Sequence, residues 1–63
     1  MNVTIGSCYK KLSTGRQYVV SDLEVTEDQE VFITLREVNT IHSRYIPMRE
    51  LCSQYKEVKK NNP

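Results

Sequence analysis

The chain has 63 residues, of which 38% are hydrophobic and 27% are charged, and it carries a net charge of +1. A chain of this length folds as one domain with a small core, and its balanced composition excludes a disordered chain. The low net charge argues against a protein that binds nucleic acids mainly through their phosphates.

The first predicted strand covers residues 3–12, where apolar and polar side chains alternate as in a half-buried pleated strand. Gly6 interrupts this alternation and predicts a bulge or a sharp bend. Residues 13–15 predict a tight turn, because Gly15 adopts a positive φ without steric cost.

The second and third strands are predicted over residues 16–26 and 30–37, and the acidic segment of residues 26–29 predicts the turn between them. The two strands should therefore form an antiparallel hairpin. Ser21 and Asp22 are poor residues for a strand interior, so we expect a bulge in the second strand there.

The third strand, EVFITLRE, carries the strongest pattern in the chain. Val31, Ile33 and Leu35 occupy one face of the strand, and only Phe32 breaks the polar row on the other face. Every other apolar cluster is too short to form a core alone. We therefore expect this strand to be central, with Ile33 at the middle of the core.

The fourth strand is predicted over residues 44–48, after a connection at residues 38–43 where the alternation is lost. Pro47 has no N–H to donate to a ladder, so this strand should end there or lie at an edge of the sheet. Residues 47–51 predict a single α or 3₁₀ turn, because proline suits the first helical position.

The last strand is predicted over residues 53–58, followed by a polar, frayed tail at residues 59–63. The same region also fits one short helix over residues 48–58. The apolar stripe of that helix would contain Met48, Leu51, Cys52 and Tyr55. The sequence leaves both interpretations open.

Five short strands, with a tight turn after the first and a helical turn before the last, resemble a small SH3-like barrel. The residues that carry the resemblance are Gly6 and Tyr9; Gly15, Tyr18 and Val20; residues 31–35; and Tyr45, Ile46, Pro47 and Leu51. The last group is similar to a pattern in small uncharacterised bacterial and phage SH3-like domains. The resemblance implies an all-β fold, a five-stranded barrel over residues 1–58 with a single 3₁₀ or helical turn before the last strand.

The resemblance also implies a bacterial or phage accessory role. It does not extend to the signalling SH3 domains that bind proline motifs. Those domains have a long acidic first loop and a Trp-rich groove, whereas here that loop is residues 13–15 and the chain has no Trp. Recognition of proline motifs is therefore not expected.

Nothing in the sequence predicts an enzyme, a cofactor or a metal site. His42 is the single histidine and lies in a predicted loop without a nucleophile motif around it. Cys8 and Cys52 lack the spacing of zinc ligands, and we expect both to be reduced. We expect a cytoplasmic protein without membrane association, because no signal peptide and no sufficiently long apolar run is present.

Arginine and aromatic side chains gather around the connection between the third and fourth strands and predict a binding site. Both residue types are enriched in the hot spots of protein interfaces. The predicted partner-binding residues are Phe32, Arg36, His42, Arg44, Tyr45 and Arg49. The competing interpretation is a solvated basic face with the two aromatic rings in the core.

The leading hypothesis is a non-catalytic interaction module that binds and modulates another protein, as a monomer or as a weak dimer through its edge strands. The alternative is a small barrel that binds nucleic acid weakly. It would use aromatic rings together with the cations Arg36, Arg44, Arg49, Lys10 and Lys11. Carboxylates at residues 24–30 and the low net charge predict weak, salt-sensitive binding in that case.

Overall fold

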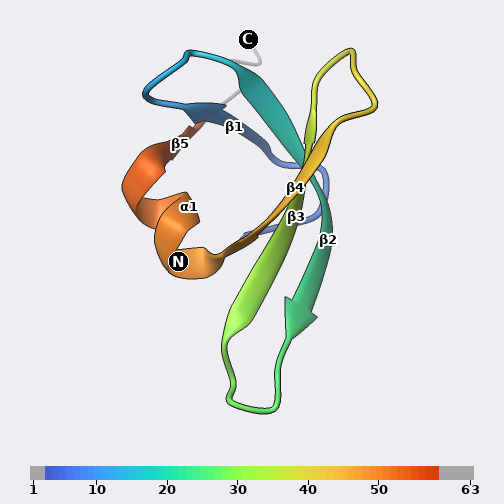
Figure 1. Ribbon diagram of the computed structural model, residues 1–63, viewed down its shortest axis with the longest axis vertical. Coiled ribbons are helices and arrows are strands. Elements are labelled where there is room, and N and C mark those ends of the chain that lie inside the picture. Colours follow the sequence, from blue (N-terminus) through green and yellow to red (C-terminus); the bar gives the residue numbers. More distant parts are fainter. Residues whose placement is uncertain (1–2, 59–63) are drawn as a thin grey trace, which may run out of the picture.

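The computed structural model describes residues 3–58 and contains five strands and one short helix (Figure 1). The elements are β1 (Cys8–Lys11), β2 (Gln17–Val25), β3 (Val31–Glu37), β4 (Ser43–Pro47), α1 (Met48–Gln54) and β5 (Tyr55–Glu57). All strands pair antiparallel in one open sheet of order β4-β3-β2-β1-β5. The expectation of five strands with a helical segment before the last is confirmed, as is the antiparallel pairing of the second and third strands.

The β2–β3 hairpin runs along the long axis of the molecule, and α1 lies beside it (Figure 1). The register between β2 and β3 shifts between Val20 and Asp22, so the bulge expected at Ser21 and Asp22 is confirmed. The Ser21 hydroxyl donates a 3.2 Å hydrogen bond to the carbonyl of Thr34 on the opposite strand. A bulge bends its strand and increases the local twist, and here it separates two straight segments of β2.

The core lies on one face of this sheet. Ile33 and Leu35 of β3 are completely buried, and cross-strand pairing places Ile33 between Leu23 of β2 and Ile46 of β4. The expected alternation of the third strand is therefore confirmed. The buried set is Tyr9, Tyr18, Val20, Ile33, Leu35, Ile46, Leu51 and Tyr55.

Tyr18 and Tyr55 close the core at the β1–β5 end. Their rings meet edge to face, with centroids 5.7 Å apart and planes inclined by 75°. This arrangement is favourable because the positive edge of one ring meets the negative face of the other. Tyr55 therefore ties β5 to the core through a specific ring contact as well as through burial.

The first strand is shorter than the sequence predicts. β1 begins only at Cys8, and the preceding residues approach the sheet through a turn in which Ser7 N–H donates to the Thr4 carbonyl. Gly6 has a φ of +96°, which an extended strand cannot contain. The bend expected at Gly6 is present, but it is so sharp that the residues before it do not belong to the strand.

Residues 47–58 combine parts of both sequence interpretations. The helix α1 has two turns over Met48–Gln54 instead of the single turn predicted, and β5 is only three residues long instead of residues 53–58. Pro47 is the last residue of the edge strand β4 and the N-cap of α1, not its first helical residue. The helix lengthens because it buries Leu51 completely, and it ends where Tyr55 becomes extended and enters the core.

Other expectations concern the cysteines and the ends of the chain. Cys8 is partly buried, Cys52 is exposed, and no disulfide is present among the described residues. The helix over residues 48–58 would have placed Cys52 on its apolar stripe, whereas in the structure Cys52 is exposed. In the part of the chain that the structure describes, no helix is long and apolar enough to cross a membrane. The expected tail at residues 59–63 lies outside the described residues.

Candidate functional site

The surface opposite the core, here called the outer face, brings together three of the six predicted site residues. It consists of the positions on β2, β3 and β4 that alternate with the core residues. Phe32 and Arg36 lie on β3, and Tyr45 lies on β4 directly opposite Thr34. Neighbouring strands pair with side chains on the same face, so these three side chains share one surface with Val19 of β2, the partner of Arg36.

Phe32 and Tyr45 form a closed aromatic pair on the outer face. Their rings stack with centroids 5.1 Å apart and planes inclined by only 8°. The Tyr45 hydroxyl donates a hydrogen bond to the Glu24 carboxylate. This hydrogen bond is the main cause that raises the pKa of Tyr45, followed by burial and the nearby negative charges. Each ring therefore already covers one face of the other, and the Tyr45 hydroxyl is already hydrogen-bonded to the Glu24 carboxylate.

The other predicted site residues lie elsewhere. Arg44 pairs with the buried Leu35, so it projects from the core side of the sheet. Arg49 belongs to α1, where its guanidinium contacts the Glu30 carboxylate at 3.2 Å. His42 is exposed in the β3–β4 loop. Its backbone N–H donates to the Thr40 hydroxyl, and its carbonyl accepts from the Glu37 N–H. The structure therefore does not gather all six residues into one site.

Arg44 contacts the core rather than the outer face. Its guanidinium lies near the hydroxyl of Tyr55, which is buried without a regular hydrogen-bond partner. Burial raises the pKa of Tyr55, and the positive charge of Arg44 opposes this effect only in part. Arg44 thus acts on a core tyrosine and is not positioned beside Arg36.

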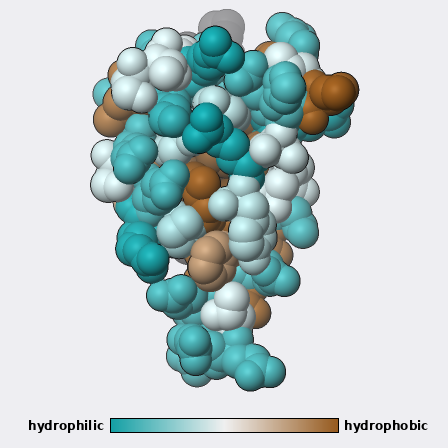
Figure 2. Space-filling view, viewed as in Figure 1, coloured by the Kyte–Doolittle hydropathy of each residue, from teal (hydrophilic) through white to brown (hydrophobic). Residues whose placement is uncertain are grey.

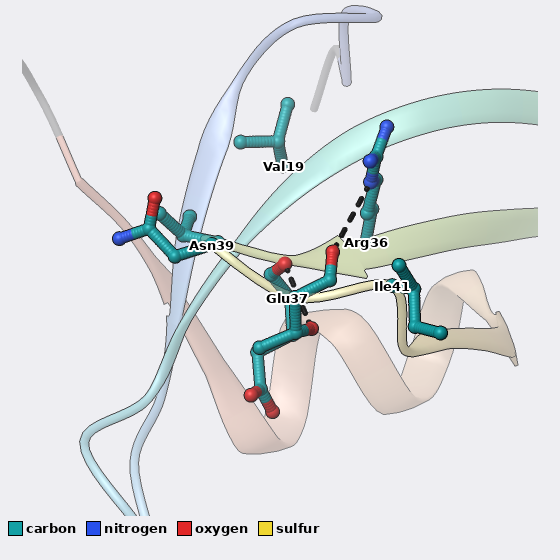
Figure 3. A pocket seen from close by; sticks show the side chains of 7 residues that line it. Val19, Arg36, Glu37, Asn39 and Ile41 are labelled. Atoms are coloured by element: carbon teal, nitrogen blue, oxygen red, sulfur yellow. Dashed lines mark hydrogen bonds between the residues drawn. The ribbon is translucent and has the colours of Figure 1, made fainter.

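Sequence reasoning missed a hollow beside Arg36. Val19 of β2 and residues 36–41 line an open hollow of about 590 Å³, here called the Ile41 hollow (Figure 3). Ile41 is 89% exposed at its margin, the largest exposure among the large apolar residues that the structure describes. Figure 2 shows a strongly hydrophobic projection at the tip of the β3–β4 loop. The signal in the sequence was Val38 and Ile41, two apolar residues inside a polar connection.

The loop that carries Ile41 is held by its own hydrogen bonds. Asn39 has a φ of +67°, a conformation that asparagine tolerates better than most residues. The Thr40 N–H and hydroxyl both donate to the Glu37 carbonyl, at 3.2 and 3.1 Å. The Thr40 hydroxyl also accepts from the His42 N–H at 3.1 Å. These bonds fix the backbone on both sides of Ile41, so its exposed side chain is presented in a defined position.

Two charged residues line the Ile41 hollow, and they differ in how they are paired. The Arg36 Nε donates a long, 3.5 Å hydrogen bond to the Thr40 carbonyl. Glu37 contacts the Arg16 guanidinium at 3.3 Å, and its side chain is only 16% exposed. Glu37 is thus paired with a cation, whereas no carboxylate among residues 3–58 forms an ion pair with Arg36. The hollow combines apolar walls with one uncompensated cation.

Among residues 3–58, no group of three or more His, Cys, Asp or Glu side chains is placed to hold a metal ion. Comparison of the chain with protein-family models, with curated proteins and with solved structures finds no match in any of the three.

Proposed function

We propose that this chain is a non-catalytic interaction module that binds another protein through the Ile41 hollow and the adjoining outer face. On this proposal the sheet is a small SH3-like barrel that serves as a rigid support for the β3–β4 loop. The order of five short strands, with α1 between the last two, supports this scaffold. The module would modulate the protein that it binds, in keeping with the accessory role that the sequence resemblance implies.

The observation that carries the proposal is the exposure of Ile41 on a hydrogen-bonded loop. An exposed aliphatic side chain loses favourable free energy unless a partner covers it, and burying it fully is worth about 1.5–3 kcal/mol. A loop that is already ordered loses little conformational entropy when it binds. Ile41 together with Val38, Val19 and Arg36 therefore supplies an apolar centre with a charged rim, the general arrangement of protein interfaces.

Binding to nucleic acid has less support. The five cations of that hypothesis do not form one surface: Arg44 and Lys11 lie on the core side of the sheet, and Arg49 is on α1, paired with Glu30. The aromatic pair is also stacked on itself and bonded to Glu24. Bases bind to open ring faces beside cations, and a carboxylate next to the ring would repel phosphates.

Affinity capture from a lysate of the source organism tests the proposal when matched variants are compared. Ile41→Asp places a charge on the proposed anchor. Val25→Asp does the same at another exposed β-branched residue, at the far end of β2, where Val25 pairs with Val31. Both variants should retain the fold, which circular dichroism and thermal melting establish before capture.

We expect at least one protein to be retained by the wild-type chain and by Val25→Asp but lost with Ile41→Asp. Proteins that bind all three baits equally would be background. The absence of any protein with the selective pattern would refute binding through the Ile41 hollow.

A further inference from the structure

We infer that the partner segment that enters the Ile41 hollow is an acidic stretch of protein, in which an apolar side chain is flanked by carboxylates. This inference rests on the proposed function and specifies the chemistry of the partner. The apolar walls, Val19, Val38 and Ile41, would cover the partner's apolar side chain. The charge at the rim determines which flanking residues are accepted.

Arg36 provides the attractive group. Its side chain projects from β3 on the same side as Val19 (Figure 3). The bond to Thr40 uses Nε, and no other hydrogen bond of this guanidinium is present among the described residues. The two terminal nitrogens therefore remain available to a ligand. Guanidinium and carboxylate groups match in geometry and form charge-assisted, often bidentate hydrogen bonds.

Glu37 does not cancel this charge. Its side chain points away from Val19 and Arg36 (Figure 3), toward the core side where its strand partner Tyr18 lies. It is also paired with Arg16. The Glu37 carboxylate therefore does not present a negative charge to whatever enters the hollow, and the electrostatic potential at the entrance is set by Arg36.

The neighbouring part of the sheet extends the positive surface. Beyond Val19, the same face continues over Cys8 and then over Lys10 of β1, which lies directly opposite Lys56 of β5. Two like charges opposite each other destabilise a sheet slightly, and an acidic ligand would relieve that repulsion. No carboxylate occupies the outward positions of this end of the described sheet. The acidic residues of the outer face, Asp22 and Glu24, lie beyond the bulge.

An acidic protein segment fits this surface better than a nucleic acid. Binding to a phosphate backbone requires several cations along its path, whereas the entrance of the hollow carries one, and the next cations on this face, Lys10 and Lys56, lie on β1 and β5 beyond Val19 and Cys8. The apolar walls would meet no matching group on a sugar–phosphate chain. An aliphatic side chain beside a carboxylate satisfies both the walls and Arg36.

Peptide titration of the full 63-residue chain, followed by ¹H–¹⁵N correlation spectra, tests the inference. The probes are acetyl-Glu-Glu-Leu-Glu-Glu-amide, the matching peptide with Lys in place of Glu, and a short oligothymidylate. We expect the acidic peptide to shift the amides of residues 36–41 and to bind at least about threefold more tightly than the basic one. This preference should shrink as salt is added.

Two variants, each of which removes one positive charge, test whether Arg36 causes the preference for the acidic peptide. Arg36→Gln should reduce the acidic-to-basic preference to near onefold, whereas Arg44→Gln, on the other side of the sheet, should leave it unchanged. Equal affinities for both peptides, an equal effect of both variants, or no shift at residues 36–41 would each overturn the inference. Tighter binding of the oligothymidylate at the same amides would overturn it in favour of nucleic acid. The capture experiment with Ile41→Asp judges protein binding separately, so either proposal can fail alone.

Discussion

The two faces of β3 differ in how deeply their side chains are buried. On one face Ile33 and Leu35 are completely buried between the neighbouring strands and α1. On the other, Phe32 and Thr34 are partly covered and Arg36 is exposed beside the Ile41 hollow. Residues one position apart thus lie in the core or on the outer face according to their side of the pleat, and on the proposed function the outer positions serve recognition. Substitutions on the outer face should change binding at a small cost in stability, and those on the core face should do the reverse.

The largest expected effect is the loss of stability in Ile33→Ala. Truncating a fully buried isoleucine typically costs about 2–5 kcal/mol, and a domain of this size has a total stability of about 3–5 kcal/mol. Much of the variant should therefore be unfolded at room temperature. Denaturant melts followed by circular dichroism measure the difference from the wild-type chain.

Thr34→Ala is the matched control on the opposite face. The sequence alone predicts a loss of no more than about 0.5 kcal/mol. The structure shows Thr34 partly covered between Tyr45 and Asp22, so we expect a loss of up to about 1 kcal/mol from the lower strand preference of alanine. Equal losses at both positions would show that both faces of β3 are core.

An intermediate loss, between those of Ile33→Ala and Thr34→Ala, is expected in Phe32→Ala, because Phe32 is only partly buried and its ring stacks on Tyr45. Removing the ring contact and the associated apolar burial should cost about 1–2 kcal/mol. Tyr45→Phe keeps the stack but removes the hydrogen bond to Glu24. Thermal melts should show a clearly larger loss for Phe32→Ala; a larger loss in Tyr45→Phe would mean that the hydrogen bond stabilises this face.

The smallest effect at neutral pH is expected in Tyr55→Phe, which removes a buried hydroxyl without a regular hydrogen bond. Stability should be unchanged or slightly raised. Burial raises the pKa of Tyr55 in the folded chain, whereas an unfolded tyrosine has a pKa of about 10. The unfolded chain therefore loses the proton first, and stability is retained below pH 10 and lost as the pH rises further.

Denaturant melts between pH 8 and about pH 11 test this direction. The decline of the unfolding free energy with pH should be less steep in Tyr55→Phe than in the wild-type chain. It should not vanish, because burial also raises the pKa of Tyr9. An identical slope in both chains would show that Tyr55 ionises as readily in the folded as in the unfolded state.

The pattern of β3 was sufficient to predict its place in the fold, because the alternation of Val31, Ile33 and Leu35 with mostly polar residues favours one register. The bulge in β2 was predictable for a similar reason, since Ser21 and Asp22 interrupt a run of strand-forming residues. The length of α1 was not. Its residues have mixed preferences, and the helix is decided by the burial of Leu51 and Tyr55 against strands distant in sequence.

The candidate site was predicted only in part, because proximity in sequence is a poor guide to the face on which a side chain lies. Arg44 and Tyr45 are adjacent, yet one faces the core side and the other the outer face. Strand pairing places Phe32, Arg36 and Tyr45, three of the six residues named from the sequence, on one face of the sheet. Val19 joins them only through the register of β2 with β3, which depends on the bulge. The hollow therefore required the three-dimensional structure.

The strand order also determines when during folding the domain is completed. β1 to β4 pair with their neighbours in sequence and can form as successive hairpins, each with a short loop to close. β5 instead pairs with β1, across nearly the whole described chain. Contacts between distant segments carry the larger entropic cost and slow folding. During synthesis, the first four strands can associate early, but the core remains open until α1 and β5 bring Leu51 and Tyr55 into place.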